Sequence, residues 1–161
     1  MIQIALVVLL NSGFWVIVHF ASGLMVHIIP DSFYAINNPL FSVKMGRYES
    51  YMYRHIFRVN FWKDKLGEAG TFLGIHPFSK KKLASDKVDY IERFILETCR
   101  GEFAHILPLL LYPLCLFWNP WPGNVIMALY ALTANIPCIV VQRYNRIRLI
   151  KLLVFRRRNG S

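Results

Sequence analysis

The sequence predicts an all-α integral membrane protein with about three transmembrane helices and a cytoplasmic amphipathic or helical segment. Hydrophobic residues make up 55% of the 161 residues and charged residues only 17%, against about 25% charged in a typical soluble domain. The charges are also segregated. Residues 1–43 contain no Lys or Arg, and residues 103–142 contain no Asp, Glu, Lys or Arg. A soluble core would interleave charged and apolar residues, so we expect a single membrane domain over residues 1–161.

The first predicted span covers about residues 2–29 and is closed by Pro30-Asp31. It is longer than the roughly 20 residues needed to cross the hydrocarbon, so we expect tilt or an overhang. A secretory signal peptide is the competing interpretation, but it requires a positively charged stretch before the apolar run. No Lys or Arg precedes this run. A retained anchor is therefore favoured.

Two further spans are predicted over about 103–118 and 124–141. A short turn rich in Pro and Gly, residues 119–123, separates them. Trp118 and Trp121 at this turn fit the aromatic belt of a membrane interface. Prolines inside both spans are tolerated in membrane helices as kinks. Because the turn is short, we expect the two spans to form an antiparallel helical hairpin.

The distribution of Lys and Arg predicts the orientation. Residues 31–102 contain twelve of them and the tail 143–161 contains seven, whereas the turn and the N-terminus contain none. The positive-inside rule places the 31–102 segment and the tail in the cytoplasm, with the N-terminus outside. Three spans satisfy this parity in a multi-pass protein of the cell membrane. An extra half-span stays open, because residues 72–78 are apolar but too short to cross.

The net charge of +10 would suggest nucleic acid as a partner of a soluble protein. Here the basic residues flank apolar spans, and anionic lipid and membrane orientation explain them better. Membrane lipids are therefore the expected partners, and nucleic acid is not. Cys99, Cys115 and Cys138 lack the spacing of a metal site, so neither a disulfide framework nor a metal centre is expected.

Arg100, Glu102 and His105 lie where the second predicted span begins. Glu102 and His105 are three residues apart and would share a helix face. A carboxylate beside a histidine fixes the ring and raises its basicity, which prepares a general base. The alternative is a histidine at the membrane interface, with Glu102 paired to Arg100 or to an arginine of the tail.

A second polar cluster directly follows the third predicted span, and its candidate binding residues are Gln142, Arg143, Asn145, Arg146 and Arg148. Guanidinium groups bind phosphate or carboxylate oxygens in pairs, so this cluster predicts an oxyanion site. A stop-transfer block touching anionic lipid is the alternative. That role requires only charge, whereas this stretch includes uncharged polar residues. Asn135 lies seven residues before Gln142 and would share its helix face.

Trp62 and Lys63 form a third candidate binding cluster within residues 60–65. The alternative is an amphipathic stretch on the membrane surface, because residues 48–62 interleave aromatic and basic side chains. The standard motifs GxSxG, HxxxxD, HExxH and a nucleotide-binding glycine loop do not occur. The local chemistry therefore indicates a general base with oxyanion-binding arginines at the cytoplasmic edge of the membrane.

Several of these motifs carry a family resemblance: Ile29-Pro30-Asp31, Trp62-Lys63, Glu97-Thr98 with Arg100, Glu102 and His105, Asn135 with Pro137, and Gln142-Arg143-Tyr144-Asn145-Arg146 with Arg148-Leu149. On these residues most of the chain resembles the glycosyl-4,4'-diaponeurosporenoate acyltransferases, the CrtO acyltransferases of staphyloxanthin-type carotenoid biosynthesis. The resemblance implies transfer of a fatty acyl group to the C6 sugar hydroxyl of a glycosylated carotenoid acid. Acyl-CoA or acyl carrier protein would be the donor, with no other cofactor.

The mechanism that we expect from the local chemistry has His105, oriented by Glu102, deprotonate the sugar hydroxyl, which attacks an acyl thioester. Arg143, Arg146 and Arg148 would hold the donor's phosphate or the tetrahedral oxyanion. Two alternatives stay open: an enzyme that modifies another glycolipid or lipid-linked group, and a non-catalytic lipid-binding membrane subunit. Three spans are few to enclose two lipid substrates, so a homo-oligomer is also left open.

Overall fold

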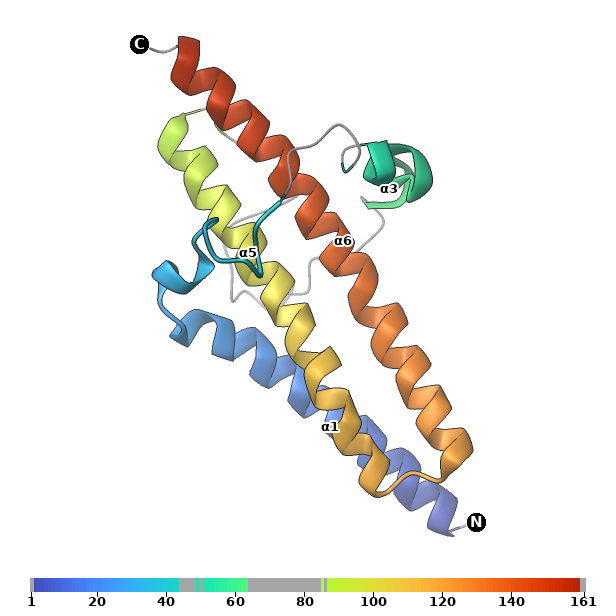
Figure 1. Ribbon diagram of the computed structural model, residues 1–161. Coiled ribbons are helices and arrows are strands. Elements are labelled where there is room, and N and C mark those ends of the chain that lie inside the picture. The colour runs from blue at the N-terminus through green and yellow to red at the C-terminus, as the bar shows by residue number, and fades with distance from the viewer. Residues whose placement is uncertain (1, 44–48, 50, 64–84, 86, 160–161) are drawn as a thin grey trace.

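The computed structural model describes residues 2–43, 49, 51–63, 85 and 87–159, and this part of the chain is helical (Figure 1). The long helices are α1 (Ile2–Ile28), α5 (Val88–Leu111) and α6 (Trp121–Asn159), and the short ones are η1 (Asp31–Tyr34), η2 (Met52–Ile56), α3 (Val59–Trp62) and η4 (Tyr112–Phe117). No strand occurs within the described ranges. The all-α expectation is confirmed. The half-span considered at residues 72–78 lies outside the described residues.

Helices α5 and α6 run antiparallel and form the most extensive helix pair (Figure 1). Far from the connecting turn, apolar side chains of α5 pack on apolar side chains of α6, namely Ile91, Phe94 and Ile95 on Leu149, Ile150 and Leu153. Helix α1 packs mainly against α5. The arrangement is the hairpin expected from the short turn, with α1 laid against it.

Helix α5 differs from the span predicted over 103–118. It begins at Val88, so its charged first half and its apolar second half form one continuous helix. The chain then tightens into the 3₁₀ helix η4, which has a proline in its first turn. Pro113 supplies no backbone N–H and its ring clashes with the preceding turn, so the α-helix cannot continue regularly. The predicted span is therefore the end of α5 followed by η4.

Two helices are long and apolar enough to cross a membrane by length and composition, Gln3–Ile28 and Trp121–Asn159. This is fewer than the three predicted from the sequence. Helix α5 keeps Glu97, Arg100 and Glu102 close to its apolar end, which lowers its hydropathy. A third crossing by α5 and η4 stays a prediction.

Helix α6 contains both the third predicted span and the basic tail in one 39-residue helix. At 1.5 Å per residue it is roughly 58 Å long, about twice the 30 Å of a bilayer's hydrocarbon. Pro137 lies inside the helix without ending it. The tail predicted as a separate segment is thus a helical extension, and it carries the arginine cluster beyond the apolar part.

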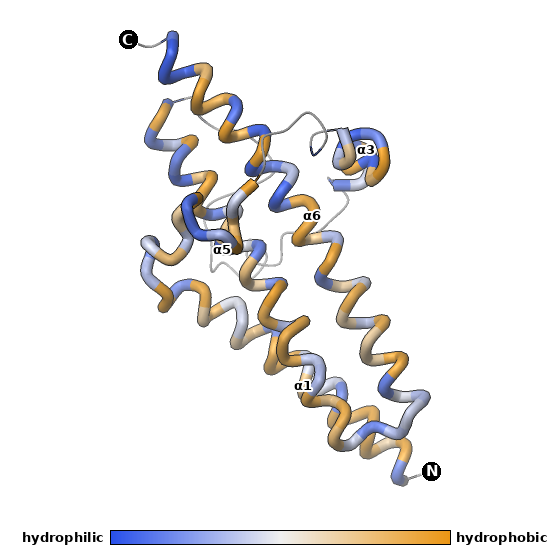
Figure 2. Tube along the Cα trace, viewed as in Figure 1, coloured by the Kyte–Doolittle hydropathy of each residue, from blue (hydrophilic) through white to orange (hydrophobic). Residues whose placement is uncertain are grey.

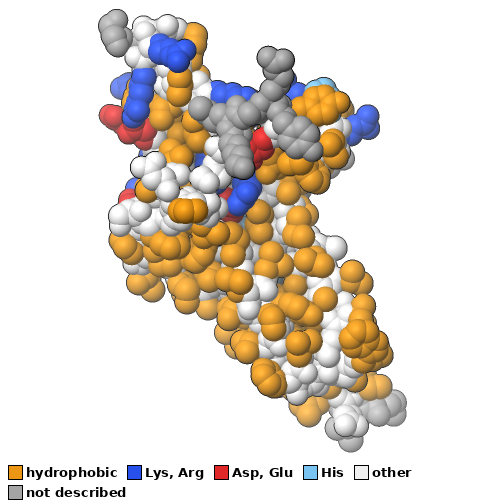
Figure 3. All heavy atoms as spheres, in the orientation of Figure 1, with side chains coloured by type: hydrophobic (Ala, Val, Ile, Leu, Met, Phe, Trp, Pro, Cys, Tyr) orange, Lys and Arg blue, Asp and Glu red, His pale blue; other side chains and the backbone are white. Residues whose placement is uncertain are grey.

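Apolar and charged surfaces occupy opposite ends of the molecule. Figure 2 shows apolar residues along α1 and the neighbouring halves of α5 and α6, and in Figure 3 the charged side chains gather toward the end with the C-terminus. Large apolar side chains such as Leu9, Ile17 and Ile28 are 68–83% exposed. Soluble proteins rarely expose so much contiguous apolar surface, so this surface suits a lipid environment.

An amide pair joins α1 to the turn between η4 and α6. The side chains of Asn11 and Asn119 exchange two hydrogen bonds of 2.8 Å, and Trp118 Nε1 donates to Asn11 Oδ1 at 2.9 Å. In apolar surroundings, such reciprocal bonding satisfies polar groups that would otherwise be costly to bury. We call Asn11, Trp118 and Asn119 the outer clasp.

Candidate active site

Glu102 of α5 holds two arginines of α6. Its side chain is completely buried, and its two oxygens accept hydrogen bonds of 2.5 Å from Arg143 Nε and Arg146 Nη2. The two arginines are three residues apart, so they share a helix face and reach the same carboxylate. Charge-assisted hydrogen bonds of this kind are about twice as strong as neutral ones. One of the sequence-based alternatives, Glu102 paired with arginines of the tail, describes this geometry.

Arg146 is fully buried and bonded on every side of its guanidinium. Besides Glu102, its partners are Thr98 Oγ1 at 3.1 Å, the Thr98 carbonyl at 3.3 Å and the Phe41 carbonyl at 2.8 Å. The guanidinium also lies over the Phe41 ring, 5.7 Å from its centroid. It joins α5, α6 and the segment after η1. This geometry differs from the expectation that Arg146 contacts substrate, because the side chain is fully buried and all three nitrogens of its guanidinium donate to the protein itself.

Arg143 is the more accessible member of the pair, with 33% of its side chain exposed. Its Nη2 donates to the Leu40 carbonyl at 3.1 Å. Tyr53 is a further neighbour: burial raises the pKa of Tyr53, and the nearby Arg143 offsets part of that rise, so the phenol stays protonated at neutral pH. Glu49 also interacts electrostatically with Arg143, so two carboxylates accompany the two guanidiniums, and Arg143 is the arginine with exposed surface that an anion could reach.

His105 is held by Asn135 of α6. The distance from His105 Nδ1 to Asn135 Oδ1 is 3.0 Å, and Asn135 is completely buried. The amide nitrogen of Asn135 donates to the Ala131 carbonyl at 2.9 Å, so the amide oxygen faces the imidazole. Nδ1 therefore donates this hydrogen bond, and in the neutral ring the basic lone pair lies on Nε2. Such a tautomer suits a general base.

This partner differs from the expected one. Glu102 and His105 do share a face of α5, as their spacing predicts, but the carboxylate is bonded to Arg143 and Arg146. Asn135, expected as a binding residue, takes the orienting position instead. Interhelical register decides this, since α6 brings Asn135 opposite His105 and the arginines opposite Glu102.

Gln142 lies two helical turns beyond Asn135 on the same face of α6. Its Oε1 is buried and has no hydrogen-bond partner within the described part of the chain. A buried acceptor without a partner costs about 1–3 kcal/mol.

The other predicted residues surround this cluster less closely. Trp62 packs beside Tyr144 and donates from Nε1 to the Phe57 carbonyl at 2.8 Å. Arg148 is exposed, with its guanidinium 5.5 Å from the centroid of the Tyr144 ring. Lys63 and Asn145 are half-buried. Tyr144, which donates to Asn60 Oδ1 at 2.5 Å, thus ties the Trp62 segment to α6.

Arg100 belongs to a second ion network. Its Nη1 donates to Glu97 Oε1 at 2.6 Å and its Nη2 pairs with Asp31, while Arg93 bridges the same two carboxylates at 3.1 and 3.2 Å. The guanidinium lies 5.4 Å from the centroid of the Tyr34 ring. Burial raises the pKa of Tyr34 to about 12, so its hydroxyl stays protonated and donates to the Val26 carbonyl at 2.8 Å. Arg100 therefore fixes η1 to α5 and does not join the Glu102 cluster.

Residues 30–154, which contain this whole site, match the family model of glycosyl-4,4'-diaponeurosporenoate acyltransferases. The chain belongs to this family. A relative named glycosyl-4,4'-diaponeurosporenoate acyltransferase from Staphylococcus aureus (strain MRSA252) is 33% identical over 152 residues, 93% of this chain and 90% of the relative. One of the same name from Staphylococcus haemolyticus is 31% identical over 142 residues, 88% and 81% of the two chains. No solved structure matches the chain.

As a member of the glycosyl-4,4'-diaponeurosporenoate acyltransferase family, the protein is an acyltransferase, and the resemblance noted in the sequence is confirmed. Sequence reasoning missed three participants in the candidate site: Tyr53 and the carbonyl groups of Leu40 and Phe41. Backbone carbonyls leave no residue-type signal, so the pattern of side chains could not have indicated them. The sequence could indicate Thr98, because it lies one turn from Glu102 on the same helix face.

Proposed function

We propose that this protein transfers a fatty acyl group from a thioester donor to a sugar hydroxyl of a glycosylated carotenoid acid in the cell membrane. The observation that carries the proposal is the His105–Asn135 pair, which lies one helical turn from the Glu102–Arg143–Arg146 cluster. Asn135 contacts Nδ1 of His105, so the basic nitrogen Nε2 lies on the other side of the ring. Deprotonation of a hydroxyl requires a basic nitrogen placed in this way. Family membership and the relatives' names support the choice of substrate.

In this mechanism His105 Nε2 takes the proton from the sugar hydroxyl as its oxygen attacks the thioester carbonyl. The tetrahedral intermediate then collapses, the carbon–sulfur bond breaks, and the imidazolium returns the proton to the leaving thiolate. Asn135 Oδ1 accepts the hydrogen bond from Nδ1 in both states. Asn135 is a positioning residue, since it acts through His105.

Arg143 supplies the positive charge. Glu102 fixes its Nε and the Leu40 carbonyl holds its Nη2, so the guanidinium is pre-organised for the donor's phosphate or for the developing oxyanion. Arg146 donates to the other oxygen of Glu102 and so helps to fix the carboxylate that holds Arg143. Gln142 Oε1, buried without a partner in the described chain, would accept a hydrogen bond from a sugar hydroxyl.

The membrane placement that we propose follows the distribution of charge. Helix α1, the α5–η4 segment and α6 would cross the bilayer, with the N-terminus outside and the arginine cluster at the cytoplasmic edge. Acyl-CoA and acyl carrier protein are soluble cytoplasmic donors, so the cluster would meet them there without a further cofactor. Membrane lipids surround the helices, and a homo-oligomer would add walls for the two lipid substrates.

Purified protein in lipid nanodiscs, supplied with an acyl-CoA and glycosyl-4,4'-diaponeurosporenoate, tests this function by mass spectrometry. The expected product is the acceptor plus one acyl group, attached through an ester to the sugar. Acylation of a different glycolipid in place of this acceptor would overturn the carotenoid assignment. Absence of any acylated product, both with the acyl-CoA and in a parallel reaction with an acylated acyl carrier protein, would overturn catalysis and leave the lipid-binding subunit.

A further inference from the structure

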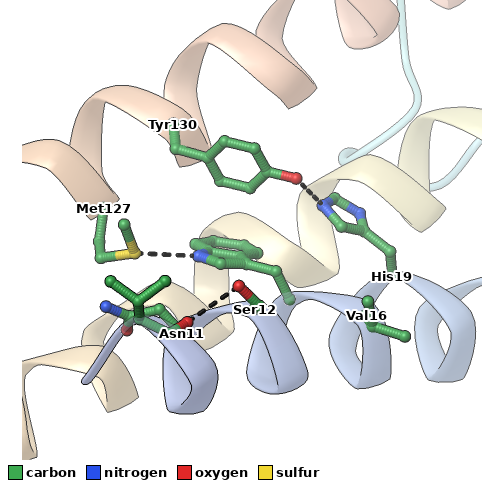
Figure 4. Close-up of a pocket in the computed structure, with 8 residues that line it drawn as sticks. Asn11, Ser12, Val16, His19, Met127 and Tyr130 are labelled. Atoms are coloured by element: carbon green, nitrogen blue, oxygen red, sulfur yellow. Dashed lines mark hydrogen bonds between the residues drawn. The ribbon is translucent and has the colours of Figure 1, made fainter. Parts of the chain in front are cut away.

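A groove opens between α1 and α6 in the apolar part of the molecule, away from the site described above (Figure 4). Its volume is about 530 Å³, and its lining includes Val8, Trp15, Val16, His19, Met127 and Tyr130. Ligand pockets of proteins typically measure about 300–1,000 Å³. From Val8 to His19 the groove follows α1 for roughly 16 Å at 1.5 Å per residue. It lies between the two helices that are long and apolar enough to cross a membrane.

Aromatic rings line this groove. The Trp15 ring lies 4.7 Å from the Tyr130 ring and 5.6 Å from the His19 ring, measured between centroids. Their polar atoms are bonded to one another and to Met127: Trp15 Nε1 donates to Met127 Sδ at 3.2 Å, and the Tyr130 hydroxyl lies 3.4 Å from His19 Nε2 (Figure 4). The rings therefore present mostly carbon to whatever occupies the groove.

The groove ends at His19 and Tyr130, and Tyr130 is its lining residue nearest to Asn135 along α6. Ala131, next to Tyr130, packs with Trp15 and Val18, and its carbonyl accepts the hydrogen bond from Asn135. Tyr130 and Asn135 are five residues apart on α6, roughly 7.5 Å along the helix axis. A chain in the groove that extends past His19 and Tyr130 would run along α6 toward the level of His105.

We propose that this groove binds the conjugated hydrocarbon chain of the acceptor lipid and so brings the sugar to His105. The inference rests on the proposed function and names the place of its acceptor. The groove lies between membrane-length helices, which indicates a hydrocarbon chain rather than a soluble ligand. Aromatic faces favour stacking with a planar π-system, which a conjugated chain has and a saturated acyl chain lacks. Ionisable groups at membrane depth, such as His19, usually mark functional positions.

Val16→Phe narrows the groove, and Ile17→Phe is its matched control. The two residues are neighbours on α1 and equally exposed, at 69% and 68%, but only Val16 lines the groove. The assay compares kcat/KM for the conjugated-chain glycoside with kcat/KM for a glycosyl ester of a short saturated acid. The larger phenylalanine side chain would occupy part of the groove that the acceptor's chain needs, so Val16→Phe should lower this ratio about tenfold. Ile17→Phe should leave the ratio unchanged.

An equal ratio in the two variants would overturn the proposal. A rise in KM for the acyl-CoA donor in Val16→Phe, with the acceptor ratio constant, would also overturn it and would assign the groove to the donor's chain. Binding is measured separately as saturable quenching of tryptophan fluorescence by the conjugated glycoside, since Trp15 lines the groove. Val16→Phe should weaken this quenching and Ile17→Phe should not. If the protein shows this quenching but acylates no acceptor, the proposed function fails while the groove assignment stands.

Discussion

At the scale of single residues, the site separates two tasks that the sequence placed on neighbouring side chains. Glu102 organises charge, because it binds Arg143 and Arg146. In the proposed mechanism His105 transfers the proton, and Asn135 is the neutral partner that orients its ring without adding charge. The buried Glu102–Arg146 pair also joins α5 to α6, so its loss affects the stability of the fold as well as activity.

Glu102→Gln should destabilise the protein by about 3–5 kcal/mol, because it leaves buried Arg146 without its carboxylate. Its control is Glu92→Gln on the same helix. Glu92 pairs with Arg157, but the two side chains are 45% and 62% exposed, and exposed pairs contribute about 0–1 kcal/mol. Thermal unfolding in detergent measures both variants. Equal melting temperatures would show that the Glu102 pair does not stabilise the hairpin.

Asn135→Ala should reduce kcat with little change in KM, because it removes the partner of His105 Nδ1 and not a substrate contact. Asn135→Asp provides a readout that a purely structural role would not move. A carboxylate there stabilises the protonated imidazole, so less neutral base is present at a given pH. The acid limb of the pH–rate profile should therefore move to higher pH. An unchanged profile in Asn135→Asp, with the fold intact, would contradict the positioning role.

At the scale of elements, α5 and α6 form the frame and α1 is attached at both of its ends. The outer clasp of Asn11, Trp118 and Asn119 fixes one end, and the Arg100–Asp31 pair fixes the other through η1. The groove between α1 and α6 begins beside the first of these attachments, because Val8 and Asn11 are among its lining residues.

Gly123→Ala should destabilise the protein by about 1–3 kcal/mol. The added Cβ would lie 2.9 Å from Asn119 Oδ1, and Asn119 cannot move without breaking its bonds to Asn11. Gly13→Ala is the control, since no atom lies within 4 Å of its added Cβ and alanine favours a helix by about 0.5–1 kcal/mol over glycine. Thermal unfolding should rank Gly13→Ala at or above wild type and Gly123→Ala below it. The reverse order would contradict the claim that the outer clasp stabilises the fold.

At the scale of the whole molecule, much of the architecture could be predicted from the sequence and the pairing within the site could not. Blocks without charge encode α1 and the apolar half of α6, and the Pro-Gly turn encodes the hairpin. Spacing alone could not show that Glu102 turns to α6 rather than to His105, because both choices satisfy a three-residue offset. The sequence analysis did not predict that α6 continues through the basic tail, because a basic composition indicates membrane orientation and does not show where a helix ends.

The proposed topology predicts which positions are reachable from each side of the membrane. Trp121→Cys and Phe155→Cys place thiols at exposed positions near the two ends of α6. The side chain of Trp121 is 78% exposed and that of Phe155 is 58% exposed. Each is introduced after the native cysteines are replaced by serine or alanine. A membrane-impermeant maleimide should label position 121 in intact cells and position 155 only after permeabilisation. Labelling of position 155 in intact cells would contradict the proposed topology and indicate the opposite orientation.

The most direct test of the central claim is acyl transfer by His105→Ala in nanodiscs, with acyl-CoA and glycosyl-4,4'-diaponeurosporenoate as substrates. Loss of a general base reduces the rate by about 10²–10⁴-fold, so we expect that loss in kcat with the melting temperature close to wild type. His55→Ala, which removes an exposed histidine stacked on Tyr51, should retain wild-type activity. Normal acyl transfer by a folded His105→Ala variant would contradict the assignment of His105 as the catalytic base.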